Sequence, residues 1–331
     1  MLALATVAVA AVVCVALIVA LRPLLQRYAL ARPNARSSHA VPTPQGGGIA
    51  VTIATAIAAL VWLPETSFGG SPVPAVLIAA FWLAAIGMID DLRPIPVAPR
   101  LALQAVAILL LFAALPVQIR IFDGVPVVLE RAILAVGLLW FVNLVNFMDG
   151  LDWMTVAEML PLTVTLALLG FLDASSATIL PVALALAGAL IGFAPFNRPV
   201  ARLFLGDVGS LPIGLLTGWC LLALAESHLA AALLLPLYYL ADATTTLLRR
   251  LLRGERFWDA HRSHFYQRAT DNGFTVGQVV TVVFMLNVLL GGLAIASATA
   301  RSPIVDGLTL MAGGSAVAAI LVLFSRPRRA P

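Results

Sequence analysis

Long apolar runs alternate with short polar segments along the whole chain. A membrane-spanning helix needs about 20 predominantly apolar residues, and the chain divides into about eleven runs of roughly that length. The runs lie near residues 2–21, 47–63, 73–89, 101–118, 132–147, 156–172, 177–195, 208–225, 229–248, 275–298 and 303–324. Because the segments between them are too short for a large soluble domain, we predict a single all-α, polytopic membrane domain over residues 1–331.

The distribution of arginine predicts how these helices cross the membrane. The chain has no lysine, and seventeen of its twenty arginines fall in segments that eleven spans place on one side. The other side holds Arg120, Arg131 and Arg301. Since cytoplasmic segments carry the excess of basic residues, we expect the N-terminus outside and the C-terminus in the cytoplasm.

Composition agrees with a membrane location and changes the meaning of the net charge. Hydrophobic residues make up 61% of the chain, charged residues make up 11%, and mean hydropathy is +1.02. The net charge of +4 does not predict nucleic-acid binding, because the arginines flank membrane spans. There, each contributes about 1 kcal/mol of attraction to anionic lipid head groups. Cys14 and Cys220 lie in apolar runs and are expected to act as small hydrophobic residues.

Five of the sixteen acidic residues stand in polar segments on the arginine-rich side. They are Asp90, Asp91, Asp149, Asp152 and Asp207. Carboxylates are oxygen ligands for hard cations, and ionisable groups beside membrane spans are costly and usually functional. The pattern therefore favours chemistry on a divalent cation or a phosphate at one surface of the bilayer.

Asp90 and Asp91 are adjacent in the chain. Their carboxylates repel one another unless a cation, an arginine or a proton relieves the repulsion. The alternative is a solvated helix end with Arg93 as the partner of the pair. The recurrence of acidic residues in later segments favours a site over that alternative.

The segment that holds Asp149 also carries amides at regular spacing. Asn143, Asn146 and Asp149 are three residues apart, which places them along one face of a helix, and Asp152 continues this stripe if the helix survives Gly150. Such a stripe can bind sugar hydroxyl groups, phosphate-bound water and a metal ion. Hydrogen bonding between helices is the alternative for the two asparagines, above all for Asn143.

Asp207 lies between Gly206 and Gly209 at the expected start of a helix. Backbone N–H groups at a helix N-terminus favour anionic oxygens. A plain N-cap role would explain Asp207 but would leave the flanking glycines unexplained. A bound Mg²⁺ that bridges to a pyrophosphate would use both features.

Two further polar segments contain residues suited to phosphate binding. Residues 22–46 hold Arg36 and His39 and lead into glycines at 46–48, which predicts either a phosphate-binding loop or a flexible connector. Residues 249–274 hold His261, Arg262 and His264. The two histidines would share a helical face, but two ligands do not make a zinc site, and phosphate binding fits better.

Two other features of this late region have structural explanations. The first arginines of residues 249–274 are well explained by side chains that extend along the lipid towards the bilayer surface. Asp242 lies just inside the preceding span, where an ion-pair partner is the expected role.

Taken in order, these motifs resemble a known family. Residues 42–48, the Asp90-Asp91 pair, and residues 143–152, 204–210 and 261–264 are similar to the polyprenyl-phosphate N-acetylhexosamine-1-phosphate transferases. This family also includes the phospho-N-acetylmuramoyl-pentapeptide transferases of peptidoglycan synthesis. The resemblance extends from residue 32 to residue 268, and five ordered motifs are far more specific than one.

The resemblance implies an activity and its partners. A sugar 1-phosphate would pass from a UDP-sugar to undecaprenyl phosphate with release of UMP, at the cytoplasmic face of a bacterial inner membrane. Mg²⁺, or Mn²⁺ in its place, would be the cofactor. The lipid bilayer is a further partner, nucleic acid is not, and a homodimer is left open.

The resemblance also implies roles for individual residues. Asp207 would bind the metal ion, and Asp90 would deprotonate or orient the lipid phosphate with Asp91 beside it. The remaining residues would bind substrate or complete the polar floor of the site; they are Asn143, Asn146, Asp149, Asp152, Phe204 as a stacking partner of uracil, His261, Arg262 and His264, with Arg36 and His39 in the first segment.

Three departures from the family pattern bear on the specific function. Gln45 precedes the glycines, Trp153 replaces the glycine usual after the second aspartate, and residues 265–267 lack the histidine run of the peptidoglycan branch. The chain therefore looks more like members that begin O-antigen or other surface glycans, with the sugar left open. A pentapeptide transferase is one alternative. A non-catalytic binder of lipid-linked sugars, which Trp153 would favour, or a transporter is another.

Overall fold

The computed structural model describes residues 1–31, 42–62, 71–114, 120–122, 124–256 and 261–328. Its long elements are all helices, which confirms the predicted all-α class. They are α1 (Leu2–Tyr28), α2 (Gly47–Leu60), α3 (Val73–Leu92), α4 (Val97–Ala114), α5 (Val127–Met148), α6 (Met154–Leu172), η2 (Ala174–Ile179), α7 (Leu180–Phe193), α8 (Asp207–Leu234), α9 (Leu237–Leu252), α10 (Phe265–Asp271), α11 (Val276–Ala300) and α12 (Pro303–Ser325).

Most of the predicted spans correspond to helices long enough to cross a membrane. Within the described residues, nine helices have the required length and apolar composition, with η2 and α7 acting as one. The two other predicted spans correspond to α2, with 14 residues, and α9, with 16. The boundary predicted between residues 225 and 229 lies later, because α8 continues to Leu234 through a non-helical residue, His228.

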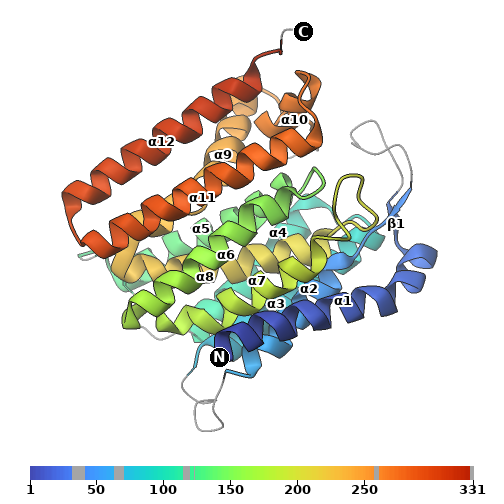
Figure 1. Cartoon of the computed structure of the whole chain (residues 1–331), viewed down its shortest axis with the longest axis horizontal. Coiled ribbons are helices and arrows are strands. Elements are labelled where there is room, and N and C mark those ends of the chain that lie inside the picture. Colours follow the sequence, from blue (N-terminus) through green and yellow to red (C-terminus); the bar gives the residue numbers. More distant parts are fainter. Residues whose placement is uncertain (32–41, 63–70, 115–119, 123, 257–260, 329–331) are drawn as a thin grey trace.

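Helix α8 forms the centre of the bundle. It is the most buried of the nine candidate spans, whereas α1 and α12 are the least buried. Figure 1 shows α1 and α12 at opposite edges of the molecule, with α8 between them. Large apolar side chains remain exposed on the outer helices, as expected for surfaces that contact lipid rather than water.

The polar segments meet at one end of the bundle, on the right in Figure 1. The short strands β1 (Leu30–Ala31) and β2 (Thr43–Pro44) pair there in antiparallel register. A Cβ at Gly48 would lie 2.1 Å from the Cα of Gly209, so α2 and α8 begin in direct backbone contact. The glycines at 46–48 thus allow a close backbone contact at the start of α8.

Candidate active site

The carboxylate of Asp91 caps the N-terminus of α8. Its Oδ1 accepts the N–H of Asp207 at 3.0 Å and its Oδ2 accepts the N–H of Val208 at 3.1 Å. The side-chain amide of Gln45 also donates to Asp91. The backbone at Gly206 has φ +77°, and a Cβ there would lie 2.5 Å from Asp91 Oδ2. The capping carboxylate therefore comes from α3 instead of from Asp207, and glycine is required where it docks.

Arg100 pairs with Asp90 and lies close to Asp207. Asp90 Oδ2 lies 2.7 Å from Arg100 Nη1, and Asp90 Oδ1 accepts the N–H of Ile95 at 2.6 Å. The same Arg100 nitrogen lies 3.8 Å from Asp207 Oδ2. Arg93, the partner considered from the sequence, is exposed instead. One guanidinium thus lies between carboxylates from two helices that are distant in the chain.

Asn146 holds Asp207 from the opposite side. Its amide nitrogen donates to Asp207 Oδ1 at 2.7 Å and to Ser210 Oγ at 2.9 Å. The side chain of Asp207 keeps 27% of its surface exposed. One oxygen of Asp207 is therefore fixed by an amide, while the carboxylate as a whole stays accessible to a ligand.

The turn after α5 carries the next two carboxylates. Because α5 ends at Met148, the condition under which Asp152 would continue the helical stripe past Gly150 is not met. Asp149 accepts a hydrogen bond from the Thr155 hydroxyl, and the buried Asp152 accepts the N–H of Ala201 at 2.9 Å.

The surroundings of Asp149 change its acidity. Burial raises the pKa of the Asp149 carboxyl to about 7; the hydrogen bond from Thr155 opposes this rise, and the charges of Asp91 and Asp152 add to it. Asp149 therefore holds its proton into the neutral range, unlike an ordinary exposed aspartate.

Asn143 packs helices together. Its amide nitrogen donates to Gln104 Oε1 at 2.7 Å and to the carbonyl of Leu139 at 2.8 Å. The residue is buried between α4 and α5. Hydrogen bonding between helices, the alternative considered for Asn143, therefore fits its position better than substrate binding does.

Asp242 organises the late segment. It accepts the N–H groups of Phe265 at 2.9 Å and Tyr266 at 3.1 Å, and lies 3.3 Å from His264 Nδ1. His264 is only 2% exposed. The structural role expected for Asp242 is confirmed, and His264 is part of the same hydrogen-bond network.

The other predicted residues of this segment lie outside a helix. α10 begins at Phe265, so the shared helical face predicted for His261 and His264 is wrong, although their rings are 4.8 Å apart. Arg262 donates to Thr270 and lies 3.4 Å from Asp271.

Tyr266 links the late segment to the acidic cluster. Its hydroxyl donates to the carbonyl of Phe147 at 3.1 Å. A Cβ at Gly150 would lie 2.1 Å from the same hydroxyl. α10 is therefore seated directly on the turn that carries Asp149.

The backbone N–H groups of the first glycine segment, residues 46–48, bind to the backbone of another segment. The N–H groups of Gly46 and Gly47 donate to the carbonyl of Phe204 at 3.1 and 2.9 Å, and that of Gly48 donates to Leu205 at 2.9 Å. These N–H groups are thus engaged and do not form the predicted phosphate cradle. Phe204 is held beside the site by this pairing, and Arg36 and His39 lie outside the described residues.

Sequence reasoning missed Arg100, Ser210, Thr155 and Tyr266 as parts of the site. Only Arg100 carried a signal. It lies in the first turn of α4, where the helix dipole disfavours a cation, so an anionic partner could have been inferred. Gln45 was noted as a departure from the family pattern, and its bond to Asp91 now explains it.

Comparisons with known proteins agree with the sequence motifs. The model of glycosyl transferase family 4 matches residues 73–225, which include all five acidic residues. A Bacillus subtilis protein named probable undecaprenyl-phosphate N-acetylglucosaminyl 1-phosphate transferase is 25% identical over 88% of this chain and 86% of the relative.

Two further relatives match different shares of the chain. The decaprenyl-phosphate N-acetylglucosaminephosphotransferase of Mycolicibacterium smegmatis is 29% identical over 78% of this chain and 72% of the relative. The phospho-N-acetylmuramoyl-pentapeptide-transferase of Clostridium beijerinckii is 29% identical over 52% of this chain and 57% of the relative.

Removal of the Asp91 cap should destabilise the bundle. Asp91→Ala leaves two N–H groups of α8 without their acceptor, so we expect a loss of about 1.5–3 kcal/mol for each charged hydrogen bond. Asp91→Asn keeps one acceptor oxygen, so its stability should lie between that of the wild type and that of Asp91→Ala. Thermal unfolding in detergent measures this. Asp271→Ala, at a carboxylate that is 55% exposed, is the control; equal melting temperatures for the two alanine variants would contradict the capping role.

The raised pKa of Asp149 predicts a pH dependence of stability. The folded state binds this proton more tightly than the unfolded state, whose pKa is near 3.8. The resulting stabilisation is complete below about pH 4 and is lost, by at most about 1.4 kcal/mol per pH unit, as pH rises through 7. Asp149→Asn should therefore gain stability relative to the wild type between pH 5 and pH 8. Parallel melting curves across that range would contradict the assignment.

Proposed function

We propose that this chain, whose residues 73–225 match the model of glycosyl transferase family 4, transfers an N-acetylhexosamine 1-phosphate from a UDP-sugar to a polyprenyl phosphate. An acceptor phosphate oxygen would form a bond to the phosphorus that carries the sugar. The bond from that phosphorus to the UMP oxygen would break, and UMP would leave. Because one phosphoanhydride replaces another, catalysis consists of positioning the reactants and neutralising their charge.

The observation that carries this proposal is the pairing of Asp90 and Asp207 around Arg100. Distances of 2.7 and 3.8 Å place one guanidinium between two carboxylates at the start of α8. Both substrates are anions, yet the described cluster holds more carboxylates than cationic groups. Productive binding of a pyrophosphate therefore requires an additional cation, which a divalent metal ion would supply.

The residues present fit Mg²⁺ or Mn²⁺. Mg²⁺ is commonly bound through one or two carboxylates together with water and substrate phosphates. Asp207 is an accessible carboxylate of this kind, and Asn146 fixes its orientation. Within the described residues, no three acidic, histidine or cysteine side chains are grouped closely enough to enclose a metal. Asp207 would hold the ion, which would neutralise the charge of the donor pyrophosphate.

We assign the remaining roles in the reaction to the surrounding side chains. Asp90 is engaged by Arg100 and a backbone N–H, so we assign it to orienting the acceptor phosphate. Asp149, with a pKa of about 7, is matched to take a proton from a phosphate whose second pKa is about 6. Asp152 holds the backbone of residue 201, and Asp91 holds Asp207 itself.

N-acetylglucosamine is the donor sugar that we propose first. The relatives named for it match 78–88% of this chain, whereas the pentapeptide transferase matches 52%. The excess of arginine in the segments beside the site supports its location at the cytoplasmic face of a bacterial inner membrane, where O-antigen or another surface glycan would begin.

Purified protein in detergent should release UMP from UDP-N-acetylglucosamine only when a polyprenyl phosphate and Mg²⁺ are both present. Asp207→Ala should lower kcat by about 100-fold or more, because it removes charge stabilisation from the transition state. Asp271→Ala, an exposed carboxylate, should retain activity. Mg²⁺-dependent release that survives Asp207→Ala would remove Asp207 from the metal site, and release only from UDP-N-acetylmuramoyl-pentapeptide would support the peptidoglycan alternative.

A further inference from the structure

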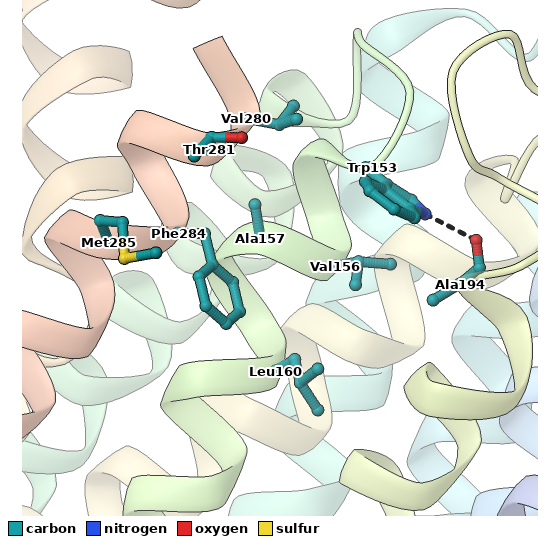
Figure 2. A pocket seen from close by; sticks show the side chains of 9 residues that line it. All are labelled: Trp153, Val156, Ala157, Leu160, Ala194, Val280, Thr281, Phe284 and Met285. Carbon is teal, nitrogen blue, oxygen red and sulfur yellow. Dashed lines mark hydrogen bonds between the residues drawn. The ribbon is translucent and has the colours of Figure 1, made fainter. Parts of the chain in front are cut away.

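The cavities between the helices differ in the charge of their lining. The pocket between α6 and α11, drawn in Figure 2, has no charged side chain in its lining. A second cavity, of about 370 Å³, lies between α9, α10 and α12 and is lined by two arginines, Arg249 and Arg326. Figure 1 shows these three elements together, beside the C-terminus. This second cavity therefore offers charge recognition that the first lacks.

Arg249 and Arg326 bring positive charge to the cavity without carboxylate partners. Arg249 lies in the last turn of α9, and Arg326 directly follows α12. Neither forms an ion pair within the described residues, whereas the neighbouring Arg250 lies 2.9 Å from Glu255. Both are exposed. Two guanidinium groups from different helices that line one cavity match the oxygens of a phosphate group.

The floor of the cavity is apolar and continues onto the lipid-facing surface. Leu321 and Val322 come from α12, which is a candidate membrane span and among the least buried of them. Beyond Arg249, the end of α9 exposes further apolar side chains, those of Leu248, Leu251 and Leu252. A free phosphate ion would use the arginines alone. A ligand that also has a hydrocarbon chain would use both parts of the lining.

Arg249 also connects the cavity to the acidic cluster. Its guanidinium lies over the ring of Phe265, 4.6 Å from the ring centre, and the N–H of Phe265 donates to Asp242 at 2.9 Å. Phe265 begins α10, and the next residue, Tyr266, rests on the turn that carries Asp149. A ligand that fixes Arg249 would therefore hold α10 in place on that turn.

We propose that this cavity binds the head group of an anionic phospholipid from the cytoplasmic leaflet, and that the bound lipid fixes α10 on the turn that carries Asp149. The ends of α9 and α12 lie on the arginine-rich side, which faces the cytoplasm under the positive-inside rule. Basic pockets between spans on this side recognise anionic head groups. Phosphatidylglycerol fits because no ammonium group accompanies its phosphate, unlike phosphatidylcholine. The alternative is that each arginine serves only the dipole of its own helix end, which would need no lipid.

Melting curves of the purified full-length protein in detergent test the site. Dioleoylphosphatidylglycerol should raise the melting temperature in a saturable way, and dioleoylphosphatidylcholine or inorganic phosphate should not. In Arg249→Gln/Arg326→Gln, the half-maximal rise should need about 30-fold more phosphatidylglycerol, the equivalent of about 1 kcal/mol for each arginine. Arg253→Gln/Arg256→Gln removes the same charge from exposed positions outside the cavity and should respond as the wild type does. Equal responses of the two double variants, or an equal rise with inorganic phosphate, would overturn the proposal.

A second pair of variants fills the cavity without changing its charge. Val322→Trp places a ring in the lining, whereas Leu323→Trp changes the next residue, which is similarly exposed but lies outside the lining. Both variants leave Arg249 free to stack on Phe265. Only Val322→Trp should reduce the response to phosphatidylglycerol, and a full response in that variant would contradict a lipid bound within the cavity.

Amide hydrogen exchange measures the effect on α10 without turnover. Phosphatidylglycerol should slow exchange at residues 265–271 in the wild type, because local opening becomes less favourable, and should not do so in Arg249→Gln/Arg326→Gln. Unchanged exchange in protein that the lipid stabilises would overturn the link to α10. Slowed exchange in protein that releases no UMP would instead refute the proposed reaction and leave the lipid site in place.

Discussion

The bond between the Asp91 carboxylate and the first two N–H groups of α8 determines where the other groups of the site can lie. It joins residues 116 and 117 positions apart and ties the end of α3 to the start of the most buried helix. Helix N–H groups at this end have no intrahelical acceptor, so an anion from a neighbouring helix stabilises them. With α8 fixed in this way, Asp207 in its first turn reaches both Asn146 and Arg100.

Local sequence pattern was sufficient to predict the helices and the end of the bundle where the site lies. Apolar runs of spanning length locate the helices. The acidic residues between them gather as expected, because each pair of spans returns the chain to the same side. The pattern could not reveal which carboxylate caps α8, since an acidic residue stands both at the start of this helix and at the end of the distant helix α3. It also left the place of Asp152 dependent on a helix that ends at Met148, and it expected a helical pair of histidines at positions that precede α10.

Electrostatic balance connects this geometry to phosphoryl transfer. Carboxylates outnumber cations around Arg100, which makes the cluster a poor anion site alone and a good one once a divalent cation is present. Burial keeps the pKa of Asp149 near neutrality and so separates its chemistry from that of Asp90, which a guanidinium holds as an ion pair.

The most direct test is a structure of the protein with Mn²⁺ and UDP-N-acetylglucosamine, in which anomalous scattering locates the metal ion. We expect the ion to be bound by a carboxylate oxygen of Asp207 and to contact the donor pyrophosphate. Asp91 should still accept the N–H groups of residues 207 and 208. A metal ion bound by Asp149 and Asp152 away from Asp207, or an Asp91 carboxylate that has left the start of α8 to bind the ion, would contradict this arrangement.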